Sequence, residues 1–82
     1  MSTKPTIKSV EPLLKKYMSK PQNGVGGSLH LFTDGNVKDR DIQFCLGTAR
    51  LINDYDGALL ARLLLEMSKT QRLKLARCAY TK

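Results

Sequence analysis

Residue types that could bind a metal gather in one short stretch of the chain. They are one imidazole, one amide, one thiol and three carboxylates: His30, Asp34, Asn36, Asp39, Asp41 and Cys45. Imidazole, carboxylate and thiolate groups are the common protein ligands of zinc and other transition metals. No standard ligand spacing occurs among them, so we predict no metal and no cofactor. A metal site at His30, Asp34 and Cys45 is the weaker alternative.

The same stretch has a simpler structural interpretation as a turn that begins a helix. Asp34-Gly35-Asn36 is a strong turn sequence, because Gly35 is free to adopt positive φ. Asn36 suits the N-cap position of a following helix, where its side chain would accept a backbone amide. His30 is then expected to form only local hydrogen bonds. We therefore assign structural roles to His30, Asp34, Gly35 and Asn36.

Nucleophilic catalysis would require a cysteine or serine beside a base. His30 is the sole histidine, and Cys45 falls on the apolar side of an expected helix. Cys45 and Cys78 form no Cys-x-x-Cys pair, and the N-terminal residues lack the apolar core of a secretory signal. We predict no catalytic residue, no enzymatic activity, reduced thiols and a cytoplasmic protein.

Basic residues supply the most site-like pattern. The formal net charge is +7, and it is concentrated at the two ends of the chain. Residues 1–20 carry +4 and residues 69–82 carry +5, whereas residues 21–68 carry −2. The predicted binding residues are Lys69, Arg72, Lys74 and Arg77, with Lys15 and Lys16 as a second patch. Such groups can contact phosphates or an acidic protein groove, and charge alone does not separate these partners.

The elements that would position these residues are helices. Apolar residues at three- and four-residue spacing predict helices over about 10–19, 37–53, 55–67 and 69–79. Residues 20–28 are rich in glycine and predict a flexible linker. Residues 29–33 alternate in part, and could form one short β-strand or half of a two-stranded ribbon before the second helix. The fold class is thus mainly α, a small single domain of three to four helices.

Several residues indicate where those helices begin. Ser9 is expected to cap the first helix, with Pro12 in its first turn. Asp54 can cap the third helix, and Ser68 with Gln71 forms a capping-box pattern before the fourth. The helix over 55–67 is the most apolar segment and is expected at the centre of the core. No apolar run is long enough to span a bilayer.

Four segments together resemble small proteins encoded in bacteriophage and prophage genomes. They are residues 26–30 (GGSLH), residues 34–36 (DGN), the Phe44-Cys45 pair and residues 63–72 (LLLEMSKTQR). The resemblance covers about residues 26–74 and implies a context in a bacterial host cytoplasm. Phage accessory genes of this kind often encode inhibitors of host machinery, including CRISPR effectors and the transcription apparatus. No particular activity is transferred by this resemblance.

These observations lead us to expect a protein that acts by stoichiometric binding. The predicted function is a phage-type inhibitor or modulator of a host protein or nucleoprotein complex, such as an anti-CRISPR protein. The alternative is a basic accessory protein that binds the phosphate backbone of a nucleic acid directly. The exposed last helix could equally form a homodimer. We expect no membrane partner.

Overall fold

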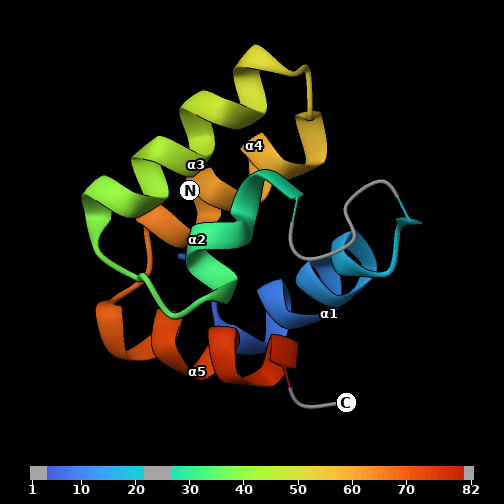
Figure 1. Cartoon of the computed structure of the whole chain (residues 1–82). Coiled ribbons are helices and arrows are strands. Elements are labelled where there is room, and N and C mark those ends of the chain that lie inside the picture. The colour runs from blue at the N-terminus through green and yellow to red at the C-terminus, as the bar shows by residue number, and fades with distance from the viewer. Residues whose placement is uncertain (1–3, 22–26, 81–82) are drawn as a thin grey trace.

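The computed structural model describes residues 4–21 and 27–80, with side chains as far as Arg77. Five α-helices and one 3₁₀ turn make up the described chain (Figure 1). Their bounds are α1 (Ile7–Met18), η2 (Gly27–Leu29), α2 (His30–Thr33), α3 (Asp39–Leu51), α4 (Tyr55–Leu65) and α5 (Lys69–Tyr80). The prediction of a mainly helical fold is confirmed. Residues 22–26 of the predicted linker lie outside the described residues.

The expected strand over residues 29–33 is wrong, because this segment forms the end of η2 and the short helix α2. Leu29, Phe32 and Thr33 are all buried. Their spacing of three and four residues is helical, and it places them on one inward face. Within these five residues the sequence fits both periodicities. No β-strand occurs in residues 4–21 or 27–80.

The turn at Gly35 ends a helix rather than a strand. Gly35 has φ +96°, as expected for a glycine at this position. Its amide donates to the Phe32 carbonyl at 2.9 Å, and the Asn36 amide donates to the Leu31 carbonyl at 2.9 Å. This pair of bonds is the Schellman arrangement that closes helix C-termini. Asp34 occupies the C-cap of α2.

The expected N-cap role of Asn36 is therefore wrong. Asn36 belongs to the end of α2, and Lys38 is the N-cap of α3, with no side-chain cap hydrogen bond. Asp39 and Asp41 lie in the first turn of α3, where negative charge complements the helix dipole.

The loop between α3 and α4 ends one helix and begins the next within two residues. Asn53 has φ +59°, and the Asp54 amide donates to the Ala49 carbonyl at 2.7 Å, which closes the C-terminus of α3. The Asp54 side chain then accepts the Gly57 amide at 3.1 Å. Asp54 thus caps α4 as predicted.

Helix α1 begins three residues earlier than expected, because Thr6 rather than Ser9 is its N-cap. The Ser9 amide donates to the Thr6 hydroxyl at 3.2 Å, and the Thr6 amide donates to the Ser9 hydroxyl at 2.9 Å. This reciprocal pair is a capping box built with serine at its third helical position. Pro12 consequently lies inside α1 rather than in its first turn. Ser68 and Gln71 form the capping box expected before α5.

The helices pack as two pairs with η2 and α2 between them (Figure 1). Helices α3 and α4 form an antiparallel hairpin, and α1 lies beside α5 on the other side of the molecule. Helix α4 also contacts α1 and η2, and it buries Leu60, Ala61 and Leu64. It therefore holds the central position expected from its apolar sequence. In the described part of the chain, no helix is both long and apolar enough to cross a membrane.

Apolar residues at the ends and outer side of α3 do not join this core. Ile42, Cys45 and Ala49 are buried. Phe44, Leu51 and Ile52 are instead exposed, and Leu51 is 86% exposed. The α3–α4 corner thus carries apolar side chains on the surface.

Candidate functional site

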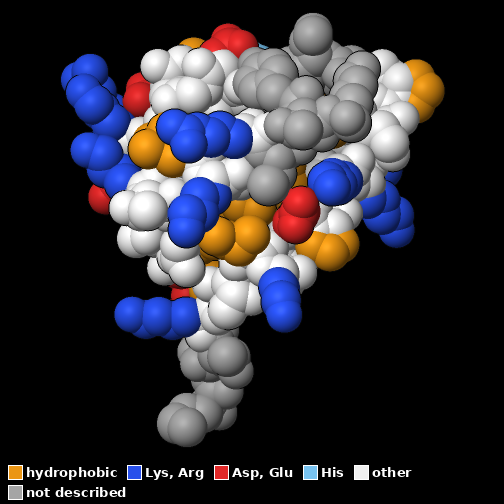
Figure 2. Space-filling model, turned by 90° about the horizontal axis from the view of Figure 1, so that it is seen from below, with side chains coloured by type: hydrophobic (Ala, Val, Ile, Leu, Met, Phe, Trp, Pro, Cys, Tyr) orange, Lys and Arg blue, Asp and Glu red, His pale blue; other side chains and the backbone are white. Residues whose placement is uncertain are grey.

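The two predicted basic patches lie on neighbouring helices. Lys15 and Lys16 are in the last turn of α1, and Lys69, Arg72, Lys74 and Arg77 are on α5. Because α1 packs beside α5, residues more than fifty positions apart in sequence come onto one side of the molecule. Figure 2 shows this side, where Lys and Arg side chains outnumber acidic ones and surround apolar patches. The structure thus supports grouping the two patches.

Arg72 is a correction to the predicted binding set, because it is only 2% exposed. Its Nε donates to the Leu64 carbonyl at 2.7 Å, its Nη1 to the Val37 carbonyl at 2.8 Å, and its Nη2 to the Leu65 carbonyl at 3.2 Å. Its Nη1 also lies 2.6 Å from Asp39 Oδ1. Those contacts occupy the guanidinium, so Arg72 fastens α5 to α4 and α3 and is not available to a partner.

The other predicted binding residues still form a positively charged surface when Arg72 is left out. We call it the basic surface, and it consists of the exposed cations of α1 and α5: Lys8, Lys15, Lys16, Lys69, Lys74 and Arg77. The two helices contain one acidic residue, Glu11, which pairs with Lys15 at 3.3 Å. Helices α3 and α4 instead contain three basic and three acidic residues. Excess positive charge is therefore a property of the α1–α5 side.

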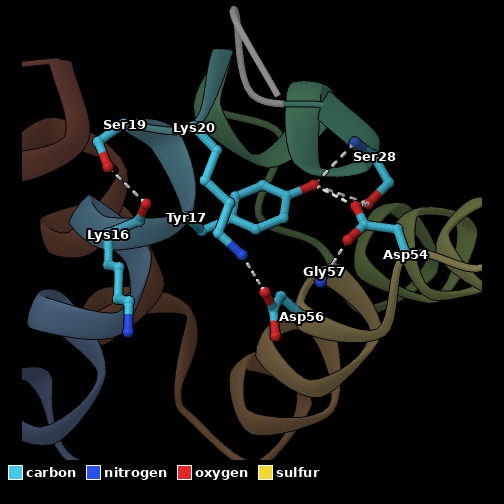
Figure 3. Close-up of polar contacts among 8 residues, drawn as sticks. All are labelled: Lys16, Tyr17, Ser19, Lys20, Ser28, Asp54, Asp56 and Gly57. Carbon is cyan, nitrogen blue, oxygen red and sulfur yellow. Dashed lines mark hydrogen bonds and ion pairs between the residues drawn. The ribbon is translucent and has the colours of Figure 1, made fainter. Parts of the chain in front are cut away.

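A buried polar cluster behind α1 was not predicted. The Tyr17 hydroxyl donates to Asp54 Oδ2 at 2.5 Å, and the Ser28 hydroxyl donates to the same oxygen at 2.9 Å (Figure 3). The Ser28 amide donates to the Tyr17 hydroxyl at 3.1 Å. These contacts join α1, η2 and the N-terminus of α4. Only the capping role of Asp54 had a signal in the sequence, since Tyr17 and Ser28 are distant from it along the chain.

Two pKa values reflect this cluster. Burial raises the pKa of the Tyr17 hydroxyl, and its hydrogen bond to Asp54 raises it further. Burial also acts to raise the pKa of Asp54, but hydrogen bonds from Tyr17, Gly57 and Ser28 outweigh that effect. The pKa of Asp54 is consequently lowered, and the group is a carboxylate at neutral pH. With Ser28 buried and Asp54 accepting three hydrogen bonds, the cluster is suited to holding helices together rather than to nucleophilic chemistry.

Gly57 makes this cluster sterically feasible. A Cβ atom at position 57 would lie 2.6 Å from Asp54 Oδ2 and would also collide with the Ser28 hydroxyl. Glycine is therefore needed here for close approach, although its backbone is ordinary helix.

A small groove opens between α1 and α4, immediately outside the cluster. Leu60 and the Tyr17 ring form its buried base, and the half-exposed Leu13 and Leu59 form its sides. Lys16, Lys20 and Asp56 supply its charged edge, and Lys20 forms an ion pair with Asp56 (Figure 3). The groove volume is about 130 Å³.

The residues first considered for metal binding do not converge. Across the described residues, no three His, Cys, Asp or Glu side chains come together as a metal site. His30 is exposed, and Cys45 is fully buried. Burial raises the pKa of the Cys45 thiol, which disfavours the reactive thiolate. The side chain of Cys78 lies outside the described part of the structure.

No protein-family model matches this chain, and neither the curated proteins nor the solved structures compared with it gave a match.

Proposed function

We propose that this protein acts by stoichiometric binding, and that its basic surface docks on the acidic surface of a host protein or nucleoprotein complex. The observation that carries the proposal is the charge segregation between the two helix pairs. Six exposed cations and one acidic residue occupy α1 and α5, whereas α3 and α4 are balanced. Such a surface attracts an anionic partner over several ångströms and favours one docking orientation.

Inhibition or modulation of the host protein would follow from occupation of its surface. A bound protein of this size covers a partner surface and excludes the substrate or subunit that uses it. The resemblance to phage-encoded proteins suggests a bacterial host and a target such as a defence complex or the transcription apparatus. We propose that target class on the resemblance alone, since the structure contributes only the charged surface.

Direct nucleic-acid binding is the second candidate. The specific observation in its favour is that Thr70, a small polar donor, is exposed on α5 between the lysines of the basic surface. Lysines and small hydroxyl donors are the usual contacts to phosphate oxygens. This alternative predicts affinity for DNA or RNA that falls steeply with salt, by close to one power of salt concentration for each phosphate contacted.

The test compares two triple variants of equal charge change. Lys16→Glu, Lys69→Glu and Lys74→Glu reverse the basic surface, and Arg40→Glu, Arg50→Glu and Arg62→Glu are the control on α3 and α4. All six side chains are exposed. Each immobilised protein is incubated with bacterial lysate, with and without nuclease, and retained proteins are identified by mass spectrometry.

We expect wild type and control to retain the same host protein after nuclease treatment, and the basic-surface variant to lose it. Equal loss in both variants would show that only net charge matters and would contradict the docking surface. Retention that disappears with nuclease would favour the nucleic-acid alternative.

A further inference from the structure

The groove between α1 and α4 has the size of one side chain. Its volume is about 130 Å³. An apolar cavity of about 150 Å³ accommodates a benzene-sized group, whereas cofactor and drug-sized ligands occupy about 300–1,000 Å³. A leucine, methionine or phenylalanine side chain therefore fits the space, and a nucleotide or similar cofactor does not.

Its walls are apolar and accessible. Leu13 is 44% exposed and Leu59 is 54% exposed, and both line the groove together with the buried Leu60. Tyr55 precedes Leu59 by one helical turn on the same side of α4, and it is 80% exposed. Together these residues extend the apolar surface from the groove toward the start of α4. An aromatic or aliphatic side chain of a partner that fills such a pocket can serve as the central anchor of an interface.

The charged residues at the edge of the groove favour a negatively charged partner. Lys20 is already paired with Asp56, and Lys15 with Glu11. Lys16 lines the groove and has no ion-pair partner among the described residues. The edge therefore presents one uncompensated cation next to an apolar space, and it is continuous with the basic surface along α1.

We propose that this groove binds a single apolar side chain from an acidic peptide segment of the partner. The apolar side chain inserts between Leu13 and Leu59, and a neighbouring carboxylate pairs with Lys16. The inference rests on the proposed function, because it names the chemistry of the partner surface that docks there. It adds a second requirement to complementary charge, namely that the partner carry an apolar side chain that fills the groove.

Three synthetic peptides test the proposal directly. One carries glutamates around a central leucine, the second replaces that leucine with serine, and the third replaces the glutamates with glutamines. Each is titrated into isotope-labelled full-length protein, and backbone amide shifts are followed by NMR. We expect saturable shifts at the groove residues of α1 and α4 with the first peptide. Affinity should fall at least tenfold or so with the serine peptide, because the buried apolar group is lost.

Matched variants identify the walls. Leu59→Ser should weaken binding of the first peptide by roughly tenfold or more, and Leu51→Ser, at a more exposed leucine outside the groove, should not. Lys16→Gln should remove the preference for glutamate over glutamine, and Arg40→Gln, at an exposed position of α3 outside the basic surface, should leave it unchanged. Equal binding of leucine and serine peptides, shifts centred on α5, or no saturable shift would each overturn the proposal. Groove shifts that depend on protein concentration without peptide would overturn it too, and would indicate a second copy as the occupant.

The lysate experiment separates this inference from the function on which it rests. If Leu59→Ser retains the captured host protein while the basic-surface variant loses it, the anchor is refuted and the docking proposal stands. If neither change affects capture, the docking proposal fails as well.

Discussion

Two charged groups, the partly buried Asp54 and the buried Arg72, attach the basic helices to opposite ends of α4. At its N-terminus, the Asp54 carboxylate receives Tyr17 from α1. At its C-terminus, the guanidinium of Arg72 from α5 donates to the carbonyls of Leu64 and Leu65. Each charge has the sign that complements the dipole of α4 at that end.

The two attachments differ in the hydrogen-bond partners of their charged groups. Arg72 donates to three backbone carbonyls, which do not titrate, and its one carboxylate partner, Asp39, is exposed. Asp54 accepts from two side-chain hydroxyls and one amide, and both Asp54 and Tyr17 can change protonation. We therefore expect the α5 attachment to be stronger and less dependent on pH, and the α1 attachment to be weaker and more dependent on it.

The largest expected effect is at Arg72. Arg72→Ala would remove one donor from each of three carbonyls and leave a gap under α5, and we expect a loss of about 3–5 kcal/mol in the free energy of unfolding. Urea denaturation followed by circular dichroism measures it. Lys74→Ala on the exposed side of α5 is the control, expected to change stability by about 0.5 kcal/mol or less. A loss at Arg72 no larger than the control would contradict its structural role.

Asp54→Ala comes next. It removes the cap of α4 and leaves the Tyr17 and Ser28 hydroxyls without their shared acceptor, so we expect a loss of about 2–3 kcal/mol. The control is Asp56→Ala, which removes an exposed ion pair with Lys20 worth roughly 1 kcal/mol or less. If both variants denature at the same urea concentration, the cluster does not hold α1 in place.

Tyr17→Phe should have a smaller effect, since the ring stays and only the hydroxyl is lost. We expect about 1–2 kcal/mol from the missing hydrogen bonds to Asp54 and Ser28. Amide hydrogen exchange should report faster opening in α1 than in α5, because the change touches one attachment only. Uniformly faster exchange in all helices would mean that the two attachments are not separable.

The pH dependence is the finest test of the comparison. The lowered pKa of Asp54 means that the unfolded chain binds its proton first on acidification. Stability should therefore fall as the pH drops below about 4. The raised pKa of Tyr17 means that the unfolded chain loses this proton first as the pH rises. The free energy of unfolding should therefore fall as the pH rises above about 10.

Variants at each attachment separate these two effects. In a plot of the urea midpoint against pH, Asp54→Asn should reduce the fall at acidic pH. Tyr17→Phe should reduce the fall at alkaline pH. Asp56→Asn, a neighbouring exposed carboxylate, is the control for the acid side. An acid side that is unchanged in Asp54→Asn would refute the role of this carboxylate.

The same comparison explains what the sequence could predict. The capping of α4 by Asp54, the Ser68–Gln71 capping box and the positive φ of Gly35 depend on contacts within a few residues, and all were predicted. Residues 29–33 are too few for their periodicity to distinguish a strand from a helix. The glycine signal that follows them ends helices as readily as it forms turns.

The errors at the site have a different cause. Arg72 was grouped with its basic neighbours by residue type, although it precedes the buried Leu75 and Ala76 by three and four positions and thus shares their face. That spacing was the available signal. Tyr17 and Ser28 meet Asp54 only through tertiary packing, and no local pattern encodes those contacts. The groove likewise exists only once α1 lies against α4.

The neighbouring positions of α1 and α5 also bear on the order of folding. Helices α3 and α4 are adjacent in the chain and can pair early, whereas contacts between the first and last described helices close a long loop and form slowly. The basic surface is thus expected to be the last part of the molecule to assemble. The protein would then bind its partner only after the whole chain has folded. Pulse-labelled hydrogen exchange should show protection of α3 and α4 before α1 and α5, and simultaneous protection would exclude this order.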